Sequence, residues 1–381
     1  MSATNAHQEI HLVNPLAGYS AYHDEIDAAI RRVLQSGSYV LGREVSAFES
    51  AFAAFCGTTN SVGVANGTDA ICLALRSLGI GPGDTVFTVA HTAVATVAGI
   101  ELAGAIPVLI DVEPDGYTID TAKLLETLRV GKSAEGQRLR PRAVVAVHLY
   151  GHPCDLSRLR EICARYELLL IEDCAQAHGA TFEGATVGTF GAAGAFSFYP
   201  TKNLGAFGDG GAVIFADSGA EGRCRALRQY GWNTADRVST IPGLNSRLDE
   251  LHAAILSVRL EHLADELAAR RAIAARYNEQ LADVVVTPFV RPGAQHAYHL
   301  YVVRARRRDE LRVALSRAGI HTGIHYALPV HMHDAYRSRL VGAGGLSVTD
   351  LLCTEILSLP MHPFLSPGDV DRVCSEIRRL A

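Results

Sequence analysis

Short runs rich in β-branched and other apolar residues alternate along this chain with longer segments of helical spacing. The runs are residues 61–64, 85–89, 106–110, 143–149, 168–171, 194–198 and 212–215. Each run has the length of a strand, and the segments between most of them are long enough for the crossovers that parallel strands need. This alternation predicts an α/β fold built on one sheet whose strands are mostly parallel.

The pattern changes toward each end of the chain. Segments of helical spacing lie at residues 22–36, 44–55, 248–277 and 309–318. A separate strand is expected at residues 298–303, after the long charged helix. We therefore predict two units: an amino-terminal segment with a large domain over residues 1–260, and a smaller α+β domain over residues 261–381.

Charge and composition exclude several kinds of partner. The 35 basic and 40 acidic residues are spread along the chain and leave a formal net charge of −5, so no nucleic-acid partner is expected. No apolar run approaches the roughly 18 residues of a membrane helix, and residues 1–10 do not resemble a leader, so no membrane partner is expected. The eight cysteines lack metal-binding spacing, which indicates reduced core thiols, a cytoplasmic location and no metal site.

Lys202 and Asp173 are the first candidates for chemistry. Lys202 follows a predicted strand and precedes a glycine-rich stretch; by itself, such a lysine is usually a solvated loop residue. Asp173 follows another apolar strand, at the carboxyl end where ligands of α/β sheets bind. Together they match the needs of pyridoxal phosphate (PLP), which takes an amine for a Schiff base and a carboxylate for its protonated ring nitrogen.

The turn at residues 64–70 is the third candidate element. Gly67 interrupts a strand, and a helix begins at once. Such a turn presents free backbone N–H groups to an anion, and the Thr68 hydroxyl adds a donor. Alone it is equally a plain helix cap; beside Lys202 and Asp173 it predicts a phosphate cradle. The glycines between residues 205 and 211 do not indicate a dinucleotide site, because they lead into a strand rather than a helix.

With these residues in place, the chain resembles the DegT/DnrJ/EryC1/StrS family of sugar aminotransferases, within the fold type I PLP enzymes. The resemblance runs nearly from end to end. It rests on NGTDA at 66–70, GIGPGD at 79–84, HLYG at 148–151, EDCAQ at 172–176, SFYPTKN at 197–203, NSRLDE at 245–250, HLY at 299–301 and LSLP at 357–360. It implies a large domain with a mostly parallel mixed sheet, plus a smaller carboxyl-terminal α+β domain.

The resemblance also implies residue roles. Lys202 forms the Schiff base with PLP, Asp173 pairs with the pyridine nitrogen, and Gln176 lies near the ring hydroxyl. The contacts implied for the phosphate come from Gly67, Thr68, Ser197 and, across a subunit interface, Asn245. A residue that reaches the neighbouring site implies a homodimer with shared active sites, although Asn245 by itself is equally a turn residue.

One departure concerns the cofactor ring. The family often has an aromatic residue at the position of Ala93, and this chain does not. His91 is the nearest planar side chain, and we expect it to stack on the ring, with a purely structural histidine as the alternative.

Two pairs of residues are candidates for substrate contact. Tyr230 and Trp232 resemble a loop near the substrate mouth in relatives that act on deoxyhexoses, and a buried anchor is the alternative. His325 and Tyr326 match the family's His-Tyr-Pro stretch near the sugar, although Ala327 replaces the proline.

The predicted activity is a ping-pong transamination with PLP. L-glutamate is the expected amino donor, and Lys202 moves a proton between the donor Cα and the cofactor C4′. The expected acceptor is a nucleotide-linked 3-keto-6-deoxyhexose; a 4-keto nucleotide sugar, a keto-inositol and a non-catalytic sensor of PLP or sugar nucleotides remain open. A sugar dehydratase of this fold replaces the lysine with histidine, so Lys202 argues against that activity.

Overall fold

The structure is a computed structural model that describes residues 9–380, except 133–135, 137, 234–235, 338–339 and 343–344. The segment inspected for a leader therefore lies mostly outside the described residues. Within them, eight strands form the central sheet: β1 Ser61–Val64, β2 Thr85–Val89, β3 Ile106–Ile110, β4 Pro141–Val147, β5 Leu169–Asp173, β8 Ala193–Ser197, β9 Gly211–Phe215 and β12 Val341–Gly342. Their order across the sheet is β1-β9-β8-β5-β4-β2-β3-β12.

The predicted mostly parallel sheet is confirmed. Neighbouring strands from β12 to β8 run parallel, and only β9 is antiparallel to its neighbours β8 and β1 among the described pairs. Each of the seven predicted runs coincides with one strand, with ends displaced by at most two residues. The displacement at β5 matters, because the strand continues to Asp173 and ends on the predicted site residue.

Helices cover both faces of this sheet. The connections contain α4 Gly67–Ser77, α5 Val94–Leu102, α6 Thr121–Val130, η1 Leu149–Gly151, α7 Leu156–Arg165 and α8 Ser218–Leu227. Helices α4, α5 and α8 share one apolar core with the sheet, and α6 and α7 share a second core on the other face. Burial on both faces explains why the strands are almost continuously apolar instead of alternating.

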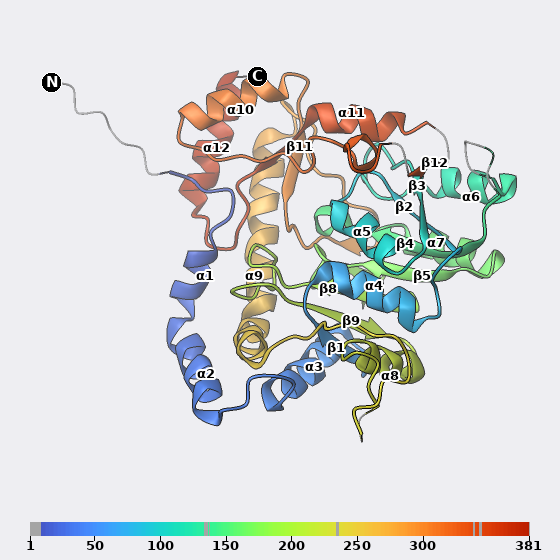
Figure 1. The fold of residues 1–381 in the computed structure, drawn as a ribbon. Coiled ribbons are helices and arrows are strands. Elements are labelled where there is room, and N and C mark those ends of the chain that lie inside the picture. Colours follow the sequence, from blue (N-terminus) through green and yellow to red (C-terminus); the bar gives the residue numbers. More distant parts are fainter. Residues whose placement is uncertain are drawn as a thin grey trace.

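The long helix α9 (Glu250–Leu281) connects the two ends of the molecule. The amino-terminal helices α1 Pro15–Ala21, α2 His23–Ser36 and α3 Arg43–Cys56 lie beside its first half. From there α9 runs to the carboxyl-terminal elements (Figure 1). The border predicted between residues 260 and 261 falls inside this continuous 32-residue helix.

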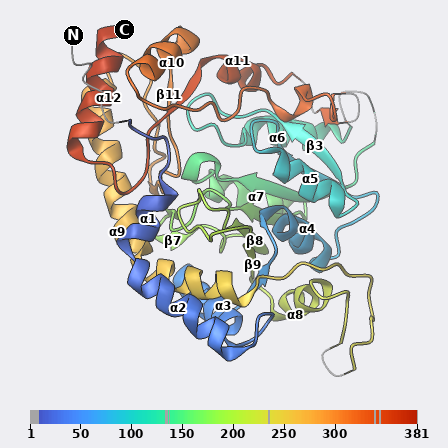
Figure 2. The ribbon, with the colours of Figure 1, turned by 60° about the vertical axis from the view of Figure 1, so that its left-hand side comes forward.

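The carboxyl-terminal elements lie at one end of the molecule (Figure 2). They are β11 Tyr301–Arg304, α10 Arg308–Arg317, η2 Val330–Met332, α11 Ser347–Glu355, β13 Ile356–Leu359 and α12 Pro367–Leu380. Of these, β11, α10, β13 and α12 share a separate small core with the second half of α9, whereas η2 and α11 pack on the cores of the large sheet. Among the contacts between the units, β12 joins the large sheet beside β3, and Ile10 pairs with Ile320. The division into two domains stays a prediction.

Smaller features complete the described chain. A minor sheet has the order β10-β6-β7, with β6 Thr181–Phe182, β7 Ala185–Thr186 and β10 Ala294–Gln295. All eight cysteines lie in the described part, and each is buried with a free thiol, as predicted. None of the helices described is both long and apolar enough to cross a membrane.

Glu172 connects strand β5 to the loop at residues 188–191 through its buried carboxylate. Its two carboxylate oxygens accept hydrogen bonds from the N–H groups of Gly188, Phe190 and Gly191, at 2.7 to 2.9 Å, and from the ring of His148 at 3.0 Å. The other ring nitrogen of His148 accepts the Cys154 N–H. Nδ1 is therefore an acceptor, and Nε2–H donates to Glu172.

Replacing this carboxylate by an amide is expected to destabilise the protein. Glu172→Gln keeps the shape but directs an NH2 group at N–H donors, so the free energy of unfolding should fall by about 2–4 kcal/mol. Urea denaturation measures the change. The exposed Glu161, paired with Arg158 on one helix, is the control: Glu161→Gln should change stability by less than about 0.5 kcal/mol. Equal effects of both changes would contradict the anchoring role.

Candidate active site

A cavity of about 250 Å³ lies at the carboxyl edge of the sheet, beside the ends of β4, β5 and β8 and the first turn of α4. We call it the Lys202 cavity. The site residues predicted from sequence that line it are Gly67, Thr68, Asp173, Gln176, Ser197 and Lys202. Segments far apart in the chain thus meet at one place, as expected where the carboxyl ends of neighbouring parallel strands share an edge.

Lys202 lies in a tight turn after β8. Its N–H donates to the Tyr199 carbonyl at 2.8 Å, and the Ala206 N–H donates to the Phe198 carbonyl at 2.7 Å. The side chain of the next residue, Asn203, donates to a main-chain carbonyl at 2.9 Å. These bonds fix the backbone on both sides of the lysine, so its side chain is held at the cavity by a rigid support.

Asp173 ends β5 and is only 5% exposed. Oδ2 accepts from the Thr96 hydroxyl at 2.8 Å, and Oδ1 accepts from the Ala175 N–H at 3.1 Å. Burial raises the pKa of Asp173 above its ordinary value, while Thr96, Ala175 and Lys202 act in the opposite direction. A buried carboxylate in this position favours a cationic group in the cavity.

Burial has the opposite effect on Lys202. It lowers the pKa of the ammonium group to about 8, and attraction to Asp173 offsets part of the decrease. An ordinary lysine, with a pKa of about 10.4, is almost fully charged at neutral pH. Lys202 therefore supplies an appreciable fraction of free amine, which is the form that acts as a nucleophile or base.

The first turn of α4 forms another wall of the cavity. Asn66 caps the helix by accepting the Asp69 N–H at 2.8 Å, and no group in the described residues accepts from the N–H of Gly67 or Thr68. A Cβ at Gly67 would lie 2.6 Å from the Cβ of Ser197, so only glycine allows this close approach. Two free amides beside two hydroxyls suit a phosphate.

Gln176 is held at both ends of its side-chain amide. Oε1 accepts from the Tyr150 N–H at 2.7 Å, and Nε2 donates to the Tyr326 hydroxyl at 3.1 Å. Burial raises the pKa of Tyr326 to about 12, so the hydroxyl stays protonated. The ring of His325 bonds the Ser358 hydroxyl at 2.8 Å. The predicted substrate residues His325 and Tyr326 thus lie behind Gln176, although neither lines the cavity.

His91 lies away from the cavity wall. It is completely buried, with Nε2 2.8 Å from the Tyr150 hydroxyl and Nδ1 3.7 Å from the Cys353 sulfur. Thr92 and Ala93, the next residues, line the cavity instead. Both ring nitrogens of His91 have protein partners, which agrees with the structural alternative, and stacking on the cofactor gains no support from this position.

Tyr230, Trp232 and Asn245 also lie outside the cavity wall. Tyr230 is 40% exposed, and its ring lies 5.0 Å from that of the half-buried Trp232. Asn245 is exposed and pairs through its backbone with Gln229. The roles of these three residues stay predictions. Their exposure leaves them accessible to a substrate or a second subunit.

Thr96 and Tyr150 are site residues that the sequence analysis did not single out. A signal existed for Thr96: two threonines, Thr92 and Thr96, follow β2 at a spacing of four residues. Thr92 precedes α5 and Thr96 lies in its first turn, and their hydroxyls are 2.8 Å apart. Tyr150 offered no local signal beyond its motif. Its partners Gln176 and His325 are 26 and 175 residues away in the chain.

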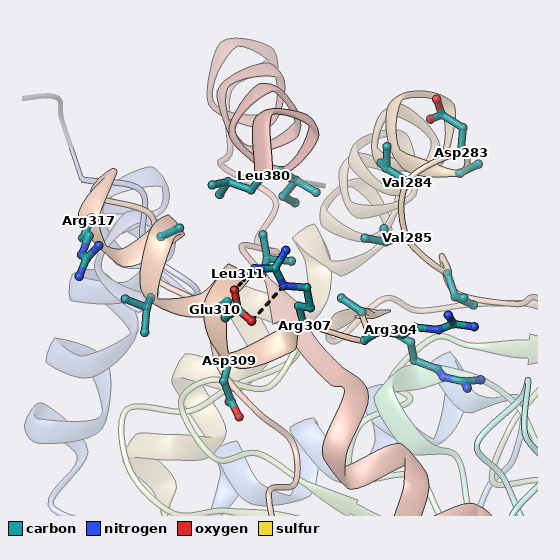
Figure 3. A pocket seen from close by; sticks show the side chains of 17 residues that line it. Asp283, Val284, Val285, Arg304, Arg307, Asp309, Glu310, Leu311, Arg317 and Leu380 are labelled. Atoms are coloured by element: carbon teal, nitrogen blue, oxygen red, sulfur yellow. Dashed lines mark hydrogen bonds and ion pairs between the residues drawn. The ribbon is translucent and has the colours of Figure 1, made fainter.

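A larger cavity, of about 990 Å³, lies elsewhere in the small unit. It is bounded by the end of α9, by α10 and by α12, and Figure 3 shows Val284, Val285 and Leu311 around it with the Arg307–Glu310 ion pair. No residue of the family motifs lines it. The chemistry of the chain therefore belongs to the smaller Lys202 cavity, where the buried titratable groups converge.

Comparison with known proteins identifies the family of the chain. The sequence model of the DegT/DnrJ/EryC1/StrS aminotransferase family matches residues 21–378. The chain belongs to this family. Its members use PLP as cofactor, and a related structure from Bacillus subtilis contains the pyridoxamine form.

Individual relatives are similar over nearly the whole chain. A dTDP-3-amino-3,4,6-trideoxy-alpha-D-glucose transaminase from Streptomyces venezuelae is 44% identical, over 96% of this chain and 94% of the relative. The erythromycin biosynthesis sensory transduction protein EryC1 of Saccharopolyspora erythraea is also 44% identical, over 95% and 97%. The crystal structure of DesV from S. venezuelae, with a ketimine intermediate, superposes with a TM-score of 0.92 at 42% identity, covering 98% of both chains.

The residues of the Lys202 cavity fit PLP on two observations of this structure. The free amides of α4 and the Gly67–Ser197 approach form a cradle suited to the phosphate. The buried Asp173 carboxylate suits a protonated ring nitrogen, and the Lys202 amine suits the aldehyde carbon. The fold of this aminotransferase thus provides one group for each part of the cofactor.

A methyl group at Gly67 is expected to weaken cofactor binding. Gly67→Ala places a Cβ against Ser197, so one of the two must move and the phosphate cradle widens. The dissociation constant for PLP should rise roughly tenfold or more, which corresponds to about 1.4 kcal/mol. Equilibrium dialysis of the apoprotein measures it. Gly222→Ala, on α8 with open space around it, should leave the constant unchanged; a normal constant in Gly67→Ala would contradict the cradle.

The pH at which Lys202 becomes reactive tests its environment. In the apoprotein its modification by an amine-directed reagent should rise with a midpoint near pH 8, because the neutral amine is the reactive form. Asp173→Asn removes the group that raises the lysine pKa, so the midpoint should move lower. Peptide mass spectrometry follows Lys202, and the exposed Lys132 in the same sample corrects for reagent decay. A midpoint near 10.4 would show that burial does not act as described.

Proposed function

We propose that this protein transfers an amino group from L-glutamate to a nucleotide-linked 3-keto-6-deoxyhexose. The observation that carries the proposal is the convergence of Lys202, Asp173 and the free amides of α4 on one cavity. The acceptor is supported by the name of the S. venezuelae relative, which places an amino group at C3 of a dTDP-linked deoxysugar. A dTDP-linked 3-keto sugar is accordingly the first acceptor to test.

The proposed roles follow from the contacts at the cavity. Gly67, Thr68 and Ser197 bind the phosphate, because their amides and hydroxyls form the cradle. Asp173 keeps a proton on the ring nitrogen, and its own bonds to Thr96 and Ala175 hold it in place. This acidic partner is needed because a buried ring cation without one would lose its proton.

Lys202 has two roles in this proposal. Its amine would hold the cofactor through a Schiff base in the resting enzyme and would be free once an amino donor occupies the site. Bound PLP supplies an electron sink for the electron pair left on the donor Cα. The freed Lys202 amine, with its lowered pKa, accepts the proton from Cα and returns it at C4′. The second half of the reaction reverses these proton transfers on the keto sugar.

The remaining assignments concern the outer part of the site. Asn245 is proposed to reach the phosphate of a neighbouring subunit in a homodimer, which is consistent with its exposure. Tyr230 and Trp232 are proposed to contact the sugar nucleotide, since they form an accessible aromatic pair. A cytoplasmic location, expected from the eight unpaired cysteines, belongs to the same proposal.

A non-catalytic sensor, a 4-keto acceptor and a keto-inositol acceptor are less well supported. The names of several relatives specify transaminases that form 3-amino sugars on dTDP. The name of EryC1 describes a sensory transduction protein. This chain has Lys202 and Asp173, the lysine and the carboxylate that turnover requires. Turnover is therefore the outcome that the experiment below is designed to detect.

The visible spectrum before and after addition of L-glutamate tests the proposal. The wild-type holoenzyme should lose its long-wavelength absorbance as the pyridoxamine form appears, and a dTDP-linked 3-keto-6-deoxyhexose should restore it. Lys202→Ala should not convert, because it lacks the base. Lys132→Ala, at an exposed lysine far from the motifs, should behave as wild type. A coloured protein that no amino donor changes would support a sensor, and a protein that does not bind PLP would refute the proposal.

A further inference from the structure

We propose that Tyr150 is a positioning residue: through a buried chain of hydrogen bonds from His91 to His325 it holds Gln176 so that an amide N–H faces the Lys202 cavity. The inference rests on the proposed function and deepens it, because it assigns how Gln176 is oriented, the residue that the family resemblance implies near the ring hydroxyl. It concerns residues that contact one another and of which only Gln176 lines the Lys202 cavity.

The orientation of the Gln176 amide is determined by its partners. The Tyr150 main-chain N–H can only donate, so the atom that it contacts at 2.7 Å must be the carbonyl oxygen of Gln176. The NH2 group therefore occupies the other position and donates to the Tyr326 hydroxyl at 3.1 Å. An NH2 group has two hydrogens, so a second N–H remains for an acceptor in the cavity that Gln176 lines.

The side chain of Tyr150 is fixed by hydrogen bonds in which the donor and the acceptor can each be assigned. Its hydroxyl contacts the His325 carbonyl, which can only accept, so Tyr150 donates there. The same oxygen then accepts from Nε2–H of His91 at 2.8 Å. Nδ1 of His91 consequently lacks a proton and faces the Cys353 thiol at 3.7 Å. Burial lowers the pKa of His91 to about 4, so this neutral tautomer persists at neutral pH.

The backbone of Tyr150 also has a conformation that directs its N–H at the Gln176 side chain. Its φ of 61° and ψ of 0° lie in the left-handed region, which is unfavourable for a residue with a Cβ. Gly151 follows with φ 96°, and a Cβ there would lie 2.9 Å from the main-chain carbonyl oxygen of Gln176. The turn therefore packs closely on Gln176 and directs the Tyr150 N–H at its side chain.

This network joins parts of the chain that are distant in sequence. His91, Tyr150 and Gln176 follow strands of the large sheet, whereas His325, Tyr326 and Cys353 come from the carboxyl-terminal unit. Gln176 and Tyr326 are 150 residues apart. A donor N–H directed at the ring oxygen of a bound cofactor favours its ionised form, so the network should lower the pKa of the cofactor chromophore.

Tyr150→Phe removes one hydroxyl and nothing else from this network. The pKa of the holoenzyme chromophore, measured by pH titration of its absorbance, should rise by about one unit, which is a tenfold change in proton affinity. Tyr117→Phe is the matched control, because Tyr117 is equally buried, its ring lies 6.1 Å from that of Tyr150, and its hydroxyl is influenced by Arg304 and takes no part in the chain from His91 to His325. A shift in both variants, or in neither, would overturn the proposal.

Two further measurements separate this inference from the proposed function. In a Gln176→Leu background, Tyr150→Phe should move the chromophore pKa no further, because its effect passes through Gln176; an additional full shift would overturn the positioning role. In the apoprotein, His91→Leu and Tyr150→Phe each lower the free energy of unfolding, and the loss in the double variant should differ from the sum of the two single losses. This cycle needs no cofactor, so it decides the network even if the protein fails to bind PLP, and additive effects would overturn it.

Discussion

The electrostatic relation between Asp173 and Lys202 is the constraint on which the rest of the site depends. Burial raises the pKa of the carboxylate and lowers that of the amine, so each is shifted toward its neutral form while the other opposes the shift. Two such groups are tolerated inside a protein only when donors and acceptors satisfy them. Thr96 and the Ala175 amide stabilise the carboxylate, and the tight turn after β8 holds the lysine. The cavity is therefore organised for a cationic ring before any ligand enters.

The two adjacent carboxylates at the end of β5, Glu172 and Asp173, have different roles because they lie on opposite faces of the strand. Successive side chains of a strand point to opposite sides. Glu172 points away from the cavity, where its oxygens hold the loop at residues 188–191 and the His148 ring. Asp173 points into the cavity. One residue stabilises the support and the next presents the charge, so a register error of one position would exchange a structural group for a chemical one.

The carboxyl-terminal unit completes the site without lining the Lys202 cavity. Helix α9 continues through the expected domain border, β12 extends the large sheet, and the segment with His325 and Tyr326 contacts Tyr150 and Gln176 from behind. These contacts fix the orientation of a polar side chain at the cavity wall. His325 and Tyr326, which the family resemblance indicated as substrate contacts, thus make hydrogen bonds to other protein groups in this structure.

The sequence by itself determined the strands, the sheet class and the principal site residues, because these depend on local patterns: apolar runs of strand length, a glycine that opens a helix, and polar residues at strand ends. Lys202, Asp173, Gly67 and Thr68 follow from such patterns, Ser197 and Gln176 follow from the family motifs, and all six line one cavity. Only the tertiary structure decided that His91 turns away while Thr92 and Ala93 line the cavity, that Thr96 bonds Asp173 across 77 residues, and that Tyr150 orients Gln176. Such contacts arise when distant segments pack together, and a single chain offers no local pattern that encodes which side chains will then meet.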